Sequence, residues 1–197
     1  STGRIPGMTA PVLHHPATYD DLLAVPENLV AELIDGELHT SPRPRARHAV
    51  ASSRLGARLT NAFDFGDGGP GGWWILDEPE IHFGPRVDTQ VAVPDLAGWR
   101  RERMPEIPQD HRFRVIPDWI CEITSPSTAH LDRVVKMPLY AKYGVGHAWR
   151  IDPEAQTLEV FRLEEGRWVV IGMYGREQRV NAEPFEALEL DLKDLWA

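Results

Sequence analysis

Apolar and polar positions predict a mixed α/β domain built around one buried strand. The run Trp119 to Ile123 in PDWICEIT is apolar except for Glu122 and is flanked by prolines, which is typical of a buried strand that contains one acid. A carboxylate in such a strand is strongly destabilised by desolvation unless a cation, a hydrogen-bond donor or a proton compensates it. Glu122 therefore needs a partner.

The first third of the chain is expected to form a short helix, a hairpin and a longer helix. Thr18 precedes YDDLLAV, with two acids in the first turn, which predicts an N-capped helix that ends at Pro26. In LVAELIDGELHT, two β-prone runs flank an Asp-Gly pair, which predicts a hairpin whose first strand contains Glu32. Apolar residues at helical spacing predict an amphipathic helix over residues 46–63, ended by GDGGPGG.

The rest of the chain is expected to contain most of the sheet. WWILDEPEIHF and QVAVPDL predict consecutive strands, and Asp95 follows an apolar run in the second of them. The polar, proline-rich segment GWRRERMPEIPQDHRFRVIP predicts a lid or a substrate loop. Ser127 is expected to cap a crossover helix that runs to about Tyr143, and three alternating strands follow: HAWRIDP, TLEVFRL and RWVVIGMYG.

Length and composition indicate one soluble domain. The 197 residues, 42% of them hydrophobic, suffice for one sizeable core but not for two ordinary domains. We expect this domain over residues 18–197 and an N-terminal arm, disordered or derived from a tag, over residues 1–17. No apolar run approaches the roughly 20 residues of a membrane-spanning helix, so no membrane partner is expected. The single cysteine, Cys121, lies in the apolar strand, which predicts a buried side chain and a cytoplasmic location.

Charge is unevenly distributed along the chain. The net charge of -9 argues against a surface covered with phosphate-binding groups, yet one segment contains five arginines and no acid. Contact with DNA phosphates is one interpretation of this segment, and a solvated helix face after a proline-arginine loop is an equally good one. The five residues are Arg43, Arg45, Arg47, Arg54 and Arg58.

One face of the predicted crossover helix combines an acid, a lysine and a tyrosine. Asp132, Lys136 and Tyr140 are spaced four apart and so lie along one face. An exposed ion pair beside a packed tyrosine is the simplest interpretation. However, only three of the 21 basic residues are lysines, and a compact ammonium is suited to orienting water. We therefore predict a functional role for Lys136, and we expect Pro138 to kink the helix.

Two strand-borne acids suggest a metal site. If Asp95 and Glu122 lie close together, they offer the hard oxygen ligands that Mg²⁺ or Mn²⁺ prefers. A cation held by two acids, with a lysine that orients water, is a compact arrangement for hydrolysing a phosphodiester. Spacing alone does not place the two acids together, so two unrelated acids at strand ends are the alternative.

These residues resemble the PD-(D/E)XK, or restriction-endonuclease-like, nuclease superfamily. In chain order they more closely resemble the bacterial Uma-two family of restriction endonucleases, from about residue 18 to residue 163. The resemblance implies an α/β fold in which a four-stranded mixed sheet is flanked by helices, and Mg²⁺-dependent cleavage of DNA. The matching elements are AELIDGEL, His48, VPDL, CEITSPST, Asp132, Lys136, Tyr140, Trp149 and IDP.

The resemblance also implies roles for individual residues. Asp95 and Glu122 correspond to the metal-binding acids, and the backbone carbonyl of Ile123 is a further ligand. Glu32 corresponds to an early acidic site residue, although an edge-strand acid beside a turn is the alternative. His48 corresponds to an accessory residue, although a helix cap or surface histidine is the alternative.

The position of the lysine departs from the superfamily pattern. The usual lysine, two residues after the acid, is replaced here by Thr124. In the family the lysine is displaced to the following helix, where this chain has Lys136. If Lys136 pointed away from the acids, catalysis would be in doubt while the fold would not.

Two functional hypotheses follow. The first is a Mg²⁺- or Mn²⁺-dependent endodeoxyribonuclease, as a homodimer because two sites most easily cut both strands of DNA; Arg100 to Arg103 would add phosphate contacts. The second is a catalytically inactive nuclease-fold module that acts through self-association or protein binding. The acidic C-terminal segment, the seven tryptophans and exposed β edges would favour it. A small-molecule-binding barrel, suggested only by the strand count, ranks last.

Overall fold

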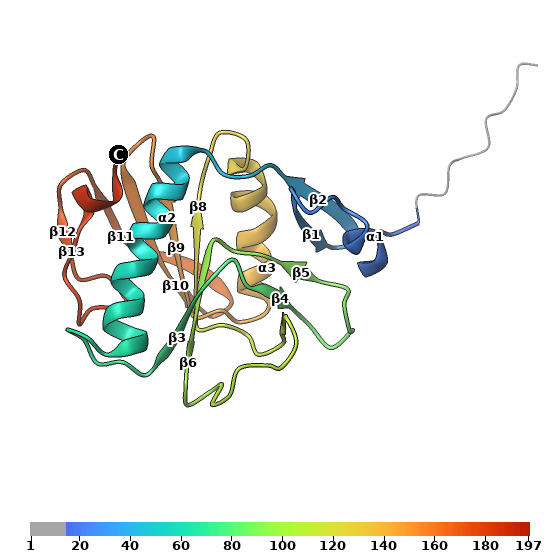
Figure 1. Cartoon of the computed structure of the whole chain (residues 1–197), viewed down its shortest axis with the longest axis horizontal. Helices are drawn as coiled ribbons and strands as arrows, with labels where there is room; N and C mark the ends of the chain where they lie inside the picture. Colours follow the sequence, from blue (N-terminus) through green and yellow to red (C-terminus); the bar gives the residue numbers. More distant parts are fainter. Residues whose placement is uncertain (1–14) are drawn as a thin grey trace, which may run out of the picture.

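A six-stranded mixed sheet is the centre of the computed structural model, which describes residues 15–197 (Figure 1). Its strands are β3 (Trp73–Asp77), β6 (Leu96–Arg100), β8 (Trp119–Ile123), β9 (His147–Asp152), β10 (Thr157–Glu164) and β11 (Arg167–Gly175). The order is β11-β10-β9-β8-β6-β3, in which only β8 and β9 are parallel. The mixed α/β class is confirmed, and the sheet exceeds the expected four strands by two.

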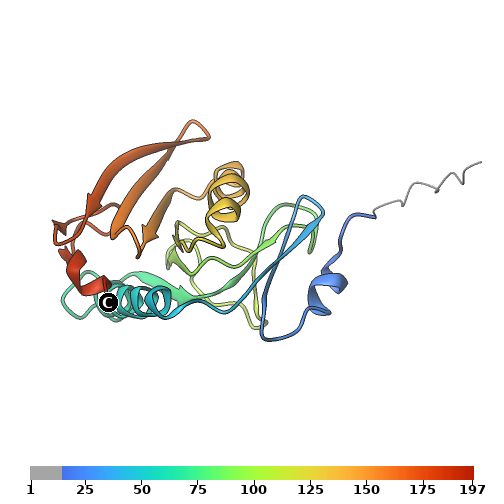
Figure 2. The same ribbon diagram turned by 90° about the horizontal axis from the view of Figure 1, so that it is seen from above.

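Strand β8 is the predicted buried strand, since all five of its residues are buried. Successive side chains of a strand point to opposite faces of the sheet. Trp119, Cys121 and Ile123 therefore pack with α2 (Ala46–Leu59) on one face, whereas Ile120 packs with α3 (Met137–Lys142) on the other. Figure 2 shows the two helices on opposite sides of the sheet. Glu122 shares the face of Ile120 and so points toward α3.

The two helices contain π-helical stretches. Helix α2 continues into a π-helical segment, η1 (Thr60–Phe65), which ends at Gly66 with a left-handed φ of 79°, so the predicted helix extends slightly beyond residue 63. Helix α3 is preceded by a second π-helical segment, η2 (Leu131–Lys136). The N–H of Met137 bonds to the carbonyl of Asp132, five residues back, just before Pro138. The disturbance expected from Pro138 thus takes the form of a π-helical register.

The predicted Ser127 cap is wrong. The Ser127 hydroxyl bonds to the Ser125 hydroxyl at 3.0 Å, and the Thr128 hydroxyl accepts from the Ser125 amide at 3.1 Å. Residues 126–128 form a turn, and helical structure begins at residue 129. The hydroxyl groups therefore fix the turn between β8 and the helix instead of capping the helix.

Two predicted strands are wrong in extent. WWILDEPEIHF divides into β3 and β4 (Glu80–His82), and QVAVPDL divides into β5 (Val91–Ala92) and β6. Each break contains a proline, Pro79 or Pro94, which cannot donate to a strand ladder. At each break the chain passes from one sheet to the other. The break before β6 contains Asp95.

The second sheet has the order β2-β1-β5-β4-β7 and contains the predicted hairpin. Strands β1 (Val30–Ile34) and β2 (Glu37–Ser41) pair on either side of Asp35 and Gly36, whose φ angles of 50° and 77° suit a tight hairpin turn. Strand β1 contacts β5 through one residue pair, and β7 is Arg112–Phe113. The hairpin is therefore held to the remaining sheet mainly by side chains.

The predicted N-terminal helix is confirmed as α1 (Tyr19–Leu23). Thr18 and Asp21 form a reciprocal capping box, in which the Thr18 amide donates to the Asp21 carboxylate at 2.8 Å. The amide of Ala17 donates to the Gly36 carbonyl at 2.8 Å. Most of the predicted N-terminal arm, residues 1–14, lies outside the described residues.

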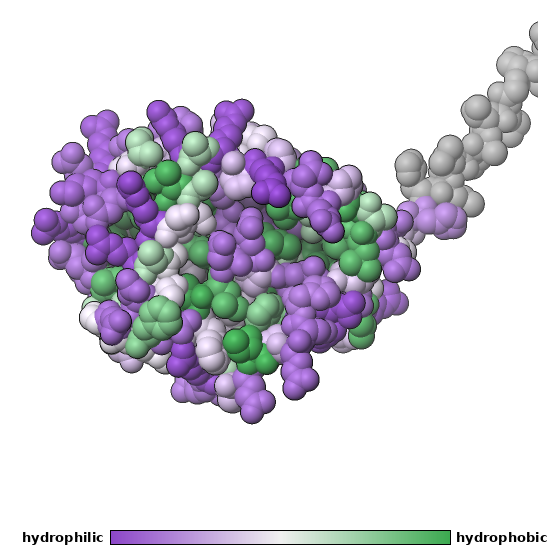
Figure 3. Space-filling model, in the orientation of Figure 1, coloured by the Kyte–Doolittle hydropathy of each residue, from purple (hydrophilic) through white to green (hydrophobic). Residues whose placement is uncertain are grey.

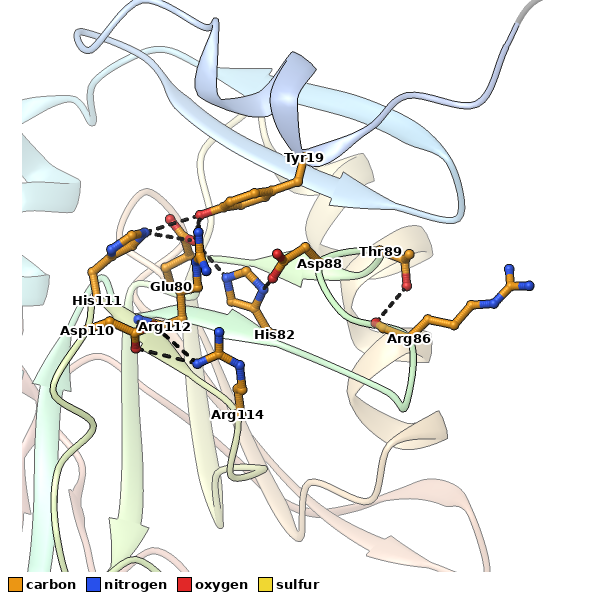
Figure 4. A network of polar contacts seen from close by, with 10 residues as sticks. All are labelled: Tyr19, Glu80, His82, Arg86, Asp88, Thr89, Asp110, His111, Arg112 and Arg114. Atoms are coloured by element: carbon orange, nitrogen blue, oxygen red, sulfur yellow. Dashed lines mark hydrogen bonds and ion pairs between the residues drawn. The ribbon is translucent and has the colours of Figure 1, made fainter.

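A polar network fastens α1 to β4, as Figure 4 shows. The Tyr19 hydroxyl donates to Glu80 Oε1 at 2.6 Å, and the guanidinium of Arg112 lies over the Tyr19 ring. The His82 imidazole lies between two carboxylates, Glu80 at 2.7 Å and Asp88 at 2.9 Å. Because α1 packs on β1, this network helps to hold the strand that contains Glu32.

Replacing Tyr19 by phenylalanine is expected to lower the free energy of unfolding by about 1–2 kcal/mol, because Glu80 loses a hydrogen-bond donor. Urea denaturation measures this change. Tyr174→Phe is the matched control, since the Tyr174 hydroxyl has no hydrogen-bond partner among the described residues. Equal losses in the two variants would show that the network does not stabilise the fold.

The chain ends in a small two-stranded sheet, β12 (Arg179–Val180) and β13 (Leu190–Asp191), and a 3-10 helix, η3 (Leu192–Leu195). Phe185 from this region packs against Trp119 and Trp149. This segment therefore completes the core on the α2 face of the sheet. Between residues 15 and 197, no helix has both the length and the apolar character needed to cross a bilayer.

Candidate functional site

A cavity of about 310 Å³ lies where the β1–β2 hairpin, the start of α2, the ends of β5 and β8, and the helix after β8 meet. Acids from four separate parts of the chain reach it: Glu32, Asp95, Glu122 and Asp132. Lys136 also lines it. The structure therefore brings together all four side chains predicted to be catalytic.

Lys136 lies between two carboxylates at the base of this cavity. Its ammonium is 2.7 Å from Glu32 Oε1 and 2.7 Å from Glu122 Oε1, and it donates to the Val93 carbonyl at 3.2 Å. The Tyr140 hydroxyl donates to the same Glu122 oxygen at 2.5 Å. All four side chains in this cluster of Glu32, Glu122, Lys136 and Tyr140 are buried.

Burial and charge act in opposite directions on this cluster. Burial alone would lower the pKa of Lys136, but the carboxylates of Glu122 and Glu32 raise that pKa well above its usual value. Burial raises the pKa of Glu122, and the adjacent Lys136 ammonium opposes this rise. Lys136 is only 3% exposed and pairs with Glu32 and Glu122, so the interpretation as an exposed Asp132–Lys136 ion pair is wrong.

Asp95 is held directly beside β8. Its Oδ2 accepts the Ile123 amide at 2.7 Å, and its Oδ1 is 3.0 Å from His48 Nε2. Burial would lower the pKa of His48, but the hydrogen bond and the charge of Asp95 raise it above the usual 6.5. His48 reaches the cavity from the first turn of α2, so it is a site neighbour rather than a surface residue or helix cap.

Glu32 is part of the same buried constellation. It is 2% exposed, and its Oε1 accepts the Val93 amide at 2.8 Å as well as the Lys136 ammonium. Both backbone polar groups of Val93, two residues before Asp95, therefore bond to site residues. The interpretation of Glu32 as an edge-strand acid beside a turn does not fit this burial.

Thr124 explains why the lysine comes from elsewhere. Its hydroxyl donates to the Ile151 carbonyl at 3.2 Å, and its side chain is buried at the end of β8. The amide of Thr124 donates to the same carbonyl at 2.7 Å. Thr124 therefore closes the β8–β9 ladder, while Lys136 provides the ammonium from the following helix.

Two site residues were missed in the sequence. Asp132 is 4% exposed and lines the cavity, and burial raises its pKa to about 6. Glu78 has an unusual φ of 45° for a residue with a side chain, donates its amide to the Asp95 carbonyl at 3.1 Å and also lines the cavity. The spacing of Asp132 from Lys136 indicated a shared face, whereas no local pattern distinguished Glu78.

Two of the five predicted DNA-binding arginines reach the cavity: Arg43 and Arg45. Arg47 instead pairs with Glu154 at 2.9 Å. Arg54 donates to the Asp194 carbonyl, and Arg58 pairs with the Asp194 carboxylate at 2.7 Å. These three arginines thus contact residues of the C-terminal half instead of the cavity.

The predicted lid is not at the cavity. Strands β6 and β8 are antiparallel, and the segment that joins them leaves β6 at Arg100 and enters β8 at Trp119. Asp95 and Ile123 lie at the opposite ends of these strands. Residues 101–118 therefore lie at the far end of the sheet from the acids, together with the predicted phosphate contacts Arg100 to Arg103, and none of them lines the cavity.

The donor set fits a hard divalent cation, although its geometry is not that of a ready-made cluster. Within residues 15–197, no three His, Cys, Asp or Glu side chains are arranged to hold a metal. Asp95 is engaged by His48 and Ile123, and Glu122 is engaged by Lys136 and Tyr140. Carboxylate oxygens nevertheless predominate, and their number exceeds that of the buried cations, which is the donor chemistry that Mg²⁺ and Mn²⁺ prefer.

Comparison with known proteins agrees with this site. The model of the family Uma2, described as "Putative restriction endonuclease", matches residues 16–193. The chain belongs to the Uma2 family. The resemblance seen in the sequence is thus confirmed, and the family description is that of a nuclease.

Solved structures include a relative of this Uma2 chain. The crystal structure described as "a putative nuclease belonging to DUF820 from Anabaena variabilis" superposes with a TM-score of 0.71 at 26% sequence identity. The match covers 91% of this chain and 97% of the other. Among curated proteins, no match was found.

Proposed function

We propose that this Uma2 protein is a divalent-metal-dependent endodeoxyribonuclease that hydrolyses phosphodiester bonds of DNA. One observation supports this proposal above the others. The Lys136 ammonium, supplied from a helix, lies 2.7 Å from both Glu32 and Glu122 in the cavity that Asp95 also lines. The family description and the DUF820 nuclease point to the same class of activity.

The side chains around the cavity have separate roles in this proposal. Asp95, Glu122 and the Ile123 carbonyl would hold Mg²⁺ or Mn²⁺, which polarises the phosphoryl oxygen and lowers the pKa of bound water. Lys136 orients the attacking water and offsets the negative charge that develops on the phosphate. Glu32 assists by fixing the Lys136 ammonium at 2.7 Å.

Three further contacts fix the groups that act directly. The Tyr140 hydroxyl fixes Glu122, and His48 and the Ile123 amide fix Asp95. A site whose groups are held in place before the reaction lowers the cost of reorganisation in the transition state. His48 is therefore a positioning residue in this proposal.

DNA would approach the cavity from the side of Arg43 and Arg45. These arginines follow β2 and line the cavity opposite the helix after β8. Because the whole chain has a net charge of -9, phosphate contacts are confined to this local region. We expect DNA binding to weaken as the salt concentration rises.

The test is cleavage of supercoiled plasmid by the full chain with Mg²⁺, with Mn²⁺ and with chelator. We expect nicking with either cation and none with chelator, and we expect Asp95→Asn to reduce nicking at least about 100-fold. Asp118→Asn is the matched control, because Asp118 lies at the opposite end of the sheet, 3.0 Å from Arg103. Nicking by Asp95→Asn at the wild-type rate would refute the assignment.

A second candidate is the catalytically inactive module that acts through self-association. Its support is β11, a nine-residue strand at one end of the sheet order, on which Val169, Val170 and Met173 are exposed. The face in Figure 3 is mostly hydrophilic, with hydrophobic residues in smaller patches. A folded dimer that neither nicks plasmid nor binds Mn²⁺ would favour this candidate. The homodimer and the cytoplasmic location stay predictions.

A further inference from the structure

Asp132 is a buried carboxylate without a cationic partner. No Lys, Arg or His nitrogen of residues 15–197 lies within 4.0 Å of its oxygens, although the side chain is only 4% exposed. The other acids of the cavity differ in this respect. Glu32 and Glu122 share Lys136, and Asp95 has His48.

A buried carboxylate of this kind destabilises the fold unless a charge compensates it. The hydroxyl of Thr128 is a hydrogen-bond partner, which offsets only part of the desolvation. The residue nevertheless lies in the wall of the cavity, where its oxygens can meet a ligand. A cation that enters this cavity would supply the missing charge.

The neighbours of Asp132 indicate where that cation would lie. The charge of Asp132 raises the pKa of Glu122, and the charge of Asp95 raises the pKa of Asp132. These shifts show that the three carboxylates lie close enough to repel one another. Each comes from a different element: Asp95 before β6, Glu122 in β8 and Asp132 in the π-helical segment η2.

The helix geometry directs Asp132 inward. Its amide bonds to the Thr128 carbonyl at 2.9 Å, which fixes the first turn after β8. Within η2, Asp132 and Lys136 are the two buried residues. The segment that supplies the lysine thus also supplies an acid to the same cavity.

We infer that Asp132 is a third carboxylate ligand of the divalent cation, supplied from η2 to a site shared with Asp95 and Glu122. This inference rests on the proposed function, because it concerns the same cation. Its three oxygen donors would come from three elements, a donor set typical of Mg²⁺ and Mn²⁺. Glu122 can remain beside Lys136 if Asp132 provides the oxygen that has no other strong partner.

The test is calorimetric titration of the full chain with Mn²⁺, together with thermal unfolding in chelator and in Mn²⁺. We expect Asp132→Asn to weaken Mn²⁺ binding more than about tenfold, since even outer-shell partners of a metal contribute 10- to 100-fold. In chelator the variant should unfold at the same or a higher temperature than the wild type, because a repelling buried charge is gone. Mn²⁺ should raise its unfolding temperature less than that of the wild type.

A purely structural role for Asp132 would give the opposite pattern. Asp132→Asn would then unfold earlier in chelator and bind Mn²⁺ as the wild type does, which would overturn the inference. Asp118→Asn, at the far end of the sheet, is the control and should bind Mn²⁺ with wild-type affinity.

Glu122→Gln separates this inference from the proposed function. Loss of Mn²⁺ binding in Glu122→Gln with wild-type affinity in Asp132→Asn would refute the third ligand and leave the proposed nuclease intact. Absence of Mn²⁺ and Mg²⁺ binding by the folded wild type would refute the proposed function and the inference together. Weakened binding in both variants supports both.

Discussion

Lys136→Met is expected to destabilise the protein by about 3–5 kcal/mol at neutral pH and to abolish cleavage. The substitution removes the ammonium that lies 2.7 Å from both Glu32 and Glu122 and so leaves two carboxylates buried without a counter-charge. Chemical denaturation measures the stability, and plasmid nicking measures the activity. The activity should fall at least about 100-fold even under conditions in which the variant is folded.

The loss of stability in Lys136→Met should depend on pH in a defined direction. Burial raises the pKa of Glu122 in the folded chain above its value in the unfolded chain, so the folded variant binds more protons over the range between the two values. Stability of the variant must therefore fall as the pH rises through that range. We expect a smaller deficit relative to the wild type at pH 5 than at pH 8.

Lys142→Met is the matched control for this experiment. Lys142 lies in α3, six residues after Lys136, and its side chain is exposed, so its removal should change the stability by no more than about 0.5 kcal/mol. Equal effects of the two substitutions would contradict the buried ion cluster. Full activity of a folded Lys136→Met variant would show that the lysine is structural.

Glu122→Gln is expected to abolish metal-dependent cleavage while the chain remains folded. Glutamine keeps the shape of the side chain and an oxygen that can accept from Tyr140, and Glu32 remains beside Lys136. It loses the negative charge that a divalent cation requires. We expect at least a 100-fold loss of nicking, on the order of the loss caused by removing one group that stabilises the transition state.

The control for Glu122→Gln is Glu159→Gln. Glu159 is also a strand glutamate in an ion pair, with Arg150 of the neighbouring strand, but it does not line the cavity. This control should nick plasmid at the wild-type rate. Wild-type nicking by Glu122→Gln would remove the central acid from the proposed site.

The local elements could be predicted because their signals are local. The proline-flanked apolar run of β8, the Asp-Gly turn of the hairpin and the Thr18 cap each depend on residues a few positions apart. The order of acids and lysine was also sufficient to indicate the nuclease family, which the family match confirms. The strand extents failed at Pro79 and Pro94, because apolar content does not show which sheet a strand joins.

The candidate site depends on contacts between distant segments. Glu32 and Lys136 are more than 100 positions apart, and sequence periodicity gives only the face of an element to which each side chain points. The antiparallel arrangement of β6 and β8 places Asp95 beside Ile123 and the predicted lid at the far end.

The sequence by itself thus determined the elements, the buried strand with its acid, and the family. Only the tertiary structure decided that Lys136 points inward and pairs with Glu32 and Glu122, that Arg54 and Arg58 contact the C-terminal segment, and that Asp132 has no counter-charge. The physical reason is that a buried charge is stabilised by whatever the packing of distant elements brings within a few ångströms of it. No pattern of neighbouring residues records that packing.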